Sequence, residues 1–141
     1  MDRIVLIVTG GSDLTDPAHW QRGLDALADA MGPDAAARVL EVHHGERAGW
    51  DRRARAWAIA RGLPQHGMTA EDAATDTLKR AQWGKRRNWL FMTAAKRRAA
   101  ELGATPVCLA GWNGSSDATA NGIAVAVFLG IQVVPYRAWR A

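Results

Sequence analysis

Residues 4–9 form an unbroken run of aliphatic and β-branched side chains, and the run stops at Gly10 and Gly11. A strand without polar alternation is typical of a parallel sheet whose two faces are both covered. Parallel strands cannot be joined by tight turns, so each needs a long crossover connection, which is usually a helix. The chain is therefore expected to fold as an α/β domain.

Strand-like and helical segments alternate along the rest of the chain. Further strands are predicted at residues 38–43, 63–68, 105–110 and 131–134. The second of these is weak, because Pro64 and Gly67 interrupt it. Helices are predicted at residues 17–31, 50–61, 70–82, 89–102 and 118–129. This alternation indicates one Rossmann-like domain over residues 1–141, with a mostly parallel sheet of four or five strands and helices on both faces.

The length and composition of the chain exclude several classes of protein. A chain of 141 residues suits a single domain. No apolar run is long enough for a membrane span or a signal peptide, so we expect a cytoplasmic protein without a membrane partner. Cys108 is the only cysteine, which excludes an internal disulfide and a cysteine-based zinc site. The adjacent His43 and His44 point to opposite faces of a strand, and His19 and His66 offer no ligand spacing. We therefore expect neither a metal site nor a cofactor.

Three of the predicted strands lead into loops that combine glycine with polar side chains. These loops are Thr-Gly-Gly-Ser-Asp at 9–13, His-His-Gly-Glu-Arg-Ala-Gly at 43–49 and Gly-Trp-Asn-Gly-Ser-Ser-Asp at 111–117. Ligands of parallel sheets bind at the carboxyl ends of the strands, where glycine lets backbone N–H groups approach an anion. A single such loop is also explained by the turn from strand to helix. Three on one edge favour a ligand that carries phosphate or ribose, although the Rossmann and P-loop glycine motifs are absent.

The order of segments resembles the SLOG superfamily, in particular its small YspA-like members, which are relatives of the LOG phosphoribohydrolases and of DprA. Residues 8–13 match the family's Thr-Gly-Gly/Ser-Arg-Asp element, except that Ser12 replaces its arginine. Residues 44–51 are similar to its His-Gly-x-Ala-x-Gly-Ala-Asp element. Residues 84–88 resemble its Gly-x-x-x-x-Arg-Asn element but are two residues shorter. Residues 113–119 keep the small polar character of its Gly-Gly-x-Gly-Thr loop with two fewer glycines.

The SLOG resemblance implies a Rossmann-like domain that binds a nucleotide or a nucleotide-derived small molecule. The expected ligand contacts lie in the three loops and the basic segment: Gly10, Gly11, Ser12, Asp13, His44, Gly45, Arg47, Arg87, Asn88, Asn113, Gly114, Ser115, Ser116, Thr119 and Asn121. Trp112, and less strongly Trp50, lie beside these loops and are candidates to stack on a base. A sensor or sequestering protein is the favoured function.

The third loop also resembles the nucleoside 2-deoxyribosyltransferase-like group, whose motif is Gly-Trp-x-x-Ser-x-Gly-Ala-x-x-Glu. In residues 111–121, Asp117 replaces a glycine and Asn121 replaces the glutamate that acts at the anomeric carbon in that group. An oxocarbenium-like centre needs a carboxylate, and an amide only forms hydrogen bonds. An N-glycosidic hydrolase or transferase acting on a nucleoside phosphate is the alternative, with Asp117 or Asp51 as the carboxylate and His44 as the base. Asp117 is also explained as the N-cap of the last helix.

The charge of the chain is unevenly distributed. Residues 79–98 contain eight of the 18 Lys and Arg residues and no Asp or Glu. Such a block suggests an anionic partner, so a nucleic-acid-binding module is the second alternative. A solvated helix face explains the block equally well, and on either view Arg87 is expected to be exposed. The helix of small residues at 118–129 is a possible homodimer interface.

Overall fold

A computed structural model describes residues 2–140 and contains one sheet of five strands. The strands are β1 (Ile4–Gly10), β2 (Val39–His44), β3 (Gln65–Gly67), β4 (Thr105–Trp112) and β5 (Gln132–Arg137). Their order across the sheet is β3-β2-β1-β4-β5, and every neighbouring pair is parallel. The predicted single Rossmann-like α/β architecture is confirmed, although β5 runs three residues beyond the predicted 131–134.

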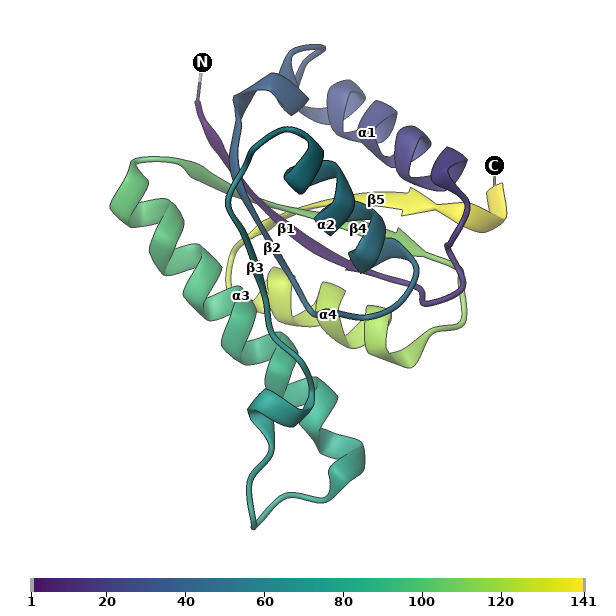
Figure 1. Ribbon diagram of the computed structural model, residues 1–141, viewed down its shortest axis with the longest axis vertical. Helices are drawn as coiled ribbons and strands as arrows, with labels where there is room; N and C mark the ends of the chain where they lie inside the picture. Colours follow the sequence, from purple (N-terminus) through teal and green to yellow (C-terminus); the bar gives the residue numbers. More distant parts are fainter. Residues whose placement is uncertain (1, 141) are drawn as a thin grey trace.

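Helices cover both faces of the sheet (Figure 1). The helices α1 (Pro17–Met31) and α2 (Trp50–Ala60) lie on one face, and α3 (Trp83–Leu102) and α4 (Asp117–Phe128) lie on the other. Along β1, Leu6 and Val8 belong to the core under α1 and α2, whereas Val5 and Ile7 belong to the core under α3 and α4. Both faces of β1 are buried, which explains why its sequence shows no polar alternation.

The segment between β3 and α3 differs from the prediction. The helix predicted at 70–82 is wrong, because residues 68–82 form an arm that leaves the body of the domain (Figure 1). The arm contains only two short 3₁₀ turns, Glu71–Ala73 and Arg80–Gln82. The N–H of Leu78 donates to Thr75 Oγ1 at 3.2 Å, and such a local side-chain bond competes with the helical ladder. The helix α3 begins at Trp83, six residues before the predicted start.

The predicted N-cap residue is correct for α1 and wrong for α4. The predicted cap of α1 is confirmed, because Asp16 Oδ1 accepts a hydrogen bond from the N–H of Ala18 at 2.9 Å. The cap of α4 is Ser116 rather than Asp117, since the N–H of Thr119 donates to Ser116 Oγ. Asp117 therefore lies in the first turn of α4, where its side chain is exposed. Within residues 2–140, no helix has the length and apolar character to cross a membrane.

Candidate ligand-binding site

The three glycine loops meet at the carboxyl edge of the sheet, because β2, β1 and β4 are parallel neighbours. The chain leaves β1 toward α1 on one face and leaves β4 toward α4 on the other, so β1 and β4 form the topological switch point. Asn113 Nδ2 donates to Asp13 Oδ1 at 3.1 Å and joins the third loop to the first. The N–H of Trp50 donates to the carbonyl of Gly11 and joins the second loop to the first.

The glycines of the first and third loops pack against Trp50. A Cβ atom on Gly10 would lie 2.2 Å from the indole ring, and one on Gly111 would lie 2.4 Å from it. Trp50 has no exposed surface, and its Nε1 donates to the carbonyl of Leu109. The interpretation of Trp50 as a stacking platform is wrong for this reason. Packing of the indole accounts for Gly10 and Gly111, and the N–H of Gly11 is already used by the carbonyl of Gly111.

His44 is enclosed by hydrogen bonds at the start of the second loop. Its Nε2 lies 2.6 Å from Gln65 Oε1, and its Nδ1 accepts the N–H of Glu46. The side chain is fully buried, and this burial lowers the pKa of the ring. Because both ring nitrogens are engaged and no surface is exposed, the geometry does not present His44 as a base to a ligand. The side chain of Arg47, two residues after Gly45, donates to the carbonyl of Gly10 at 3.1 Å and so joins the second loop to the first.

The carboxyl of Asp51 and the guanidinium of Arg87 are both buried beside the second loop. Asp51 Oδ2 accepts the backbone N–H groups of Gly45 and Arg47, whereas Oδ1 has no hydrogen-bond partner among the described residues. Burial raises the pKa of Asp51 to about 7, although nearby Arg87 favours the ionised form. Arg87 donates to the carbonyl of Gly45 and to Asn88 Oδ1. The expectation that Arg87 is exposed is wrong, because α3 starts early and turns this residue toward the sheet, where 5% of it is exposed.

Asn88 links the N-terminal ends of α3 and α4. Its Nδ2 donates to Asn121 Oδ1 at 3.0 Å and to the carbonyl of Ala118 at 3.3 Å. Beside this pair lies a cavity of about 530 Å³, lined by Ala81, Gly84, Lys85, Asn88, Asp117, Ala118 and Asn121. The structure therefore brings two of the predicted contact residues together in one cleft. Lys85 was not among the predicted contacts, although it lies inside the Gly84–Asn88 motif.

The third loop satisfies most of its own polar groups. Asn113 Oδ1 accepts the N–H groups of Ser115 and Ser116, both at 2.9 Å. Thr119 is buried, and its hydroxyl donates to Ser116 Oγ. Gly114 and Ser115 remain exposed, as do Ser12 and Asp13 of the first loop.

Trp112, the predicted stacking residue of the third loop, packs against another tryptophan. Trp112 is half-buried and meets Trp139 edge to face, with ring centroids 5.4 Å apart. The predicted contacts thus form two groups, one at the outer surfaces of the loops and one in the cleft between α3 and α4. Comparison of the chain with protein-family models, curated proteins and solved structures finds no match.

Proposed function

We propose that this SLOG-like domain binds a nucleotide or a nucleotide-derived small molecule in the cleft between α3 and α4, as a sensor or sequestering protein. The observation that carries the proposal is the polar cleft of about 530 Å³ on the carboxyl side of a sheet with a switch point. Ligands of open α/β sheets bind at such positions. The volume lies within the range of about 300–1,000 Å³ that is common for small-molecule sites.

The lining of the cleft suits the parts of a nucleotide. The amide of Asn121 offers a donor and an acceptor of the kind that binds a base edge or a ribose hydroxyl. Asn88 is 1% exposed, and its amide is already bonded to Arg87, Ala118 and Asn121, so it positions Asn121 instead of binding the ligand itself. Lys85 places an exposed ammonium group at the same cleft, and α4 begins there, so both a cation and the positive end of a helix favour phosphate. Arg87 is buried and donates two hydrogen bonds to Asn88 Oδ1, which limits the orientations of the Asn88 amide.

Thermal-shift screening with nucleoside monophosphates, cyclic nucleotides and ADP-ribose derivatives, followed by calorimetry, tests the proposal. A ligand at 100 times its Kd stabilises the folded state by about 2.7 kcal/mol. Lys85→Gln should weaken binding of a phosphorylated hit about tenfold. Arg97→Gln, which removes an exposed cation three turns further along α3, should leave the Kd unchanged. No stabilising ligand, or equal losses in both variants, would contradict the proposal.

Cleavage of an N-glycosidic bond is a second candidate function, favoured by the position of Asp117. This exposed carboxylate lines the cleft one helical turn before Asn121. Asp51 is the other carboxylate predicted for this role, but it is 2% exposed and lies behind the second loop. Product analysis separates the two functions: a hit returned unchanged supports binding alone, and free base with sugar phosphate supports cleavage.

A substitution at Asn121 sharpens the distinction between binding and cleavage. Asn121→Glu restores a carboxylate at the position where the deoxyribosyltransferase-like motif has one. The substitution fits locally, because a carboxylate oxygen can accept the same hydrogen bond from Asn88 Nδ2. Cleavage in Asn121→Glu but not in the parent protein would indicate that the parent binds the ligand without cleaving it. Cleavage in the parent that Asp117→Asn abolishes would establish the second function.

A further inference from the structure

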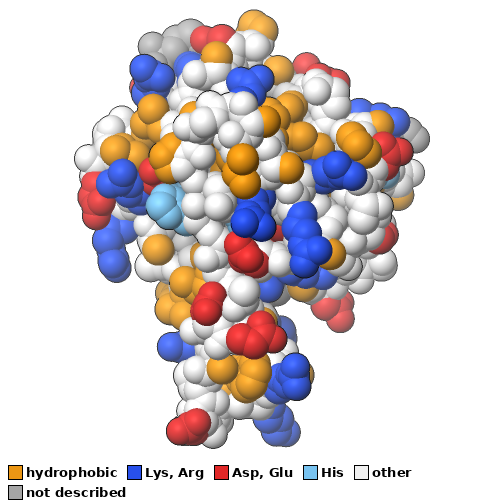
Figure 2. Space-filling model, viewed as in Figure 1, with side chains coloured by type: hydrophobic (Ala, Val, Ile, Leu, Met, Phe, Trp, Pro, Cys, Tyr) orange, Lys and Arg blue, Asp and Glu red, His pale blue; other side chains and the backbone are white. Residues whose placement is uncertain are grey.

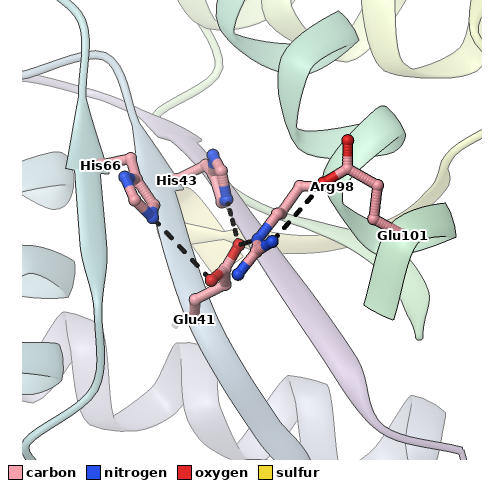
Figure 3. A network of polar contacts seen from close by, with 5 residues as sticks. All are labelled: Glu41, His43, His66, Arg98 and Glu101. Atoms are coloured by element: carbon pink, nitrogen blue, oxygen red, sulfur yellow. Dashed lines mark hydrogen bonds and ion pairs between the residues drawn. The ribbon is translucent and has the colours of Figure 1, made fainter. Parts of the chain in front are cut away.

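A second cluster of polar side chains lies where β2 and β3 run side by side (Figure 3). None of its residues lines the cleft between α3 and α4. His43 of β2 and His66 of β3 are partners across the parallel pair. Glu41 precedes His43 by two positions, so the two side chains project from the same face of β2. Arg98 of α3 reaches the same carboxylate from the covering helix, as Figure 3 shows.

The distances within this cluster are close to those of a metal site. His43 Nε2 lies 3.1 Å from Glu41 Oε1, and His66 Nε2 lies 3.8 Å from Glu41 Oε2. One ligand atom from each of the three residues lies within 4.8 Å of the other two. Ligand atoms bound to tetrahedral zinc at about 2.0–2.1 Å are about 3.3 Å apart. Side-chain movements on the order of 1 Å are therefore enough to place three ligands around one ion.

We propose that Glu41, His43 and His66 bind one divalent transition-metal ion of the zinc class. Two imidazoles and one carboxylate form the ligand set of zinc sites that keep a fourth position for water or another small ligand. Magnesium and calcium prefer sites built from oxygen atoms, so the two imidazoles select against them. The expectation of no metal site compared His66 only with residues near it in sequence, whereas the strand register makes it a neighbour of His43.

His66 is the most exposed of the three ligands. His66 lies on the edge strand with 55% of its side chain exposed, whereas Glu41 is 4% exposed. A cavity of about 180 Å³ opens beside the two histidines and is lined further by Met68 and Phe91. The exposed ring of His66 therefore gives an ion access from solvent, and the cavity has room for a ligand in the fourth position.

Arg98 supplies the positive charge that faces Glu41 in the structure. Its Nε donates to Glu41 Oε1 at 2.9 Å, and its Nη1 lies 3.5 Å from Glu101. A buried carboxylate is costly without a cationic partner, so Glu41 needs either the guanidinium or a metal ion. The Arg98 side chain is 44% exposed and can leave Glu41 for Glu101 when the ion arrives. Arg98 and the metal ion thus compete for one carboxylate.

Competition titrations of tag-free protein with Zn²⁺ and a chromophoric chelator test the proposal. We expect one ion per chain and a loss of affinity of at least tenfold in His66→Ala. This variant should fold, because His66 is largely exposed on an edge strand. His19→Ala removes a histidine from α1, on the opposite face of the sheet, and should leave the affinity unchanged. Arg98→Met should raise the affinity by removing the competing cation.

Cobalt substitution gives an independent readout of the same ligands. Co²⁺ bound to the wild type should show the visible bands of a low-coordinate ion, and His66→Ala should lose them. The absence of stoichiometric zinc binding, or equal losses of affinity in His66→Ala and His19→Ala, would overturn the proposal. An affinity that Arg98→Met does not raise overturns the role assigned to Arg98.

Discussion

Replacing Asp51 with asparagine should change the pH dependence of stability by an amount set by its burial. The pKa of Asp51 rises from 3.8 to about 7 on folding, chiefly because the carboxyl is buried. Between these two values the folded chain holds a proton that the unfolded chain has lost, so the ionised carboxylate destabilises the fold as the pH rises. At about 1.4 kcal/mol per pH unit, the difference in free energy of unfolding between wild type and Asp51→Asn should fall by about 4 kcal/mol from pH 3 to pH 8.

Urea unfolding followed by tryptophan fluorescence at each pH measures this difference. The difference between the two proteins is required because other groups oppose the trend. Burial lowers the pKa of His43 and of His44, so their contribution to stability is lost below pH 6.5 and is fully present above it. Asp29→Asn removes an exposed carboxylate and controls for the change in net charge. A difference that stays flat, or rises with pH, would show that Asp51 is ionised beside Arg87 throughout, and the assignment of a protonated acid would then be abandoned.

Three further predictions concern stability measured by the same urea titrations. Gly10→Ala should lose about 3 kcal/mol, because its Cβ would overlap the buried indole of Trp50. Gly84→Ala is the matched control and should gain up to about 1 kcal/mol, since it lies in α3 with no atom closer than 3.9 Å. Ser116→Ala should lose about 1 kcal/mol by removing the cap of α4. Arg87→Met should lose about 2 kcal/mol, because buried acceptors lose their donor; an unchanged midpoint would instead indicate an exposed, dispensable side chain.

Local sequence patterns were sufficient to predict the strands and most helices of this domain. The apolar run of β1 and the Asp-Pro pair before α1 each depend on residues that are close in sequence. The arm could not be predicted in this way, since residues 70–82 have acceptable helix propensity. Its conformation depends on local bonds such as the one from the N–H of Leu78 to Thr75 Oγ1, which propensities do not register.

The candidate site was only partly predictable, for reasons that lie in long-range packing. The strand pattern correctly predicted that the glycine-containing loops meet at one edge of the sheet. It did not predict that Gly10 and Gly111 pack against the indole of Trp50, a residue that follows the second loop. The pairing of His66 with His43 depends on the register of a three-residue strand. No local pattern contains that register, so the cluster around Glu41 becomes visible only when β3 is placed beside β2.

Half of the cations in the basic segment form contacts within the chain itself. Four of its eight cations bind the chain's own groups: Arg86 donates to the carbonyl of Ala73 and Lys96 to that of Leu129, while Arg87 and Arg98 lie against β2 and the turn that follows it. The two inward arginines are 11 residues apart on α3, which returns them to the same face after three turns.

The cations left for an external partner do not form a continuous positive surface. Among the described residues, the side chains of Lys79, Lys85 and Arg97 make no polar contact with the rest of the chain, and Arg80 lies over the ring of Trp83. The arm places Glu71, Asp72 and Asp76 just before these cations, and Figure 2 shows acidic and basic side chains mixed on it. Each phosphate contact on duplex DNA adds about 0.9 to the slope of log affinity against log salt, so a stripe of eight contacts would give a slope near −7. With half of the cations engaged internally and acids beside the rest, the described residues of the segment do not form the continuous basic stripe on which the nucleic-acid alternative depends.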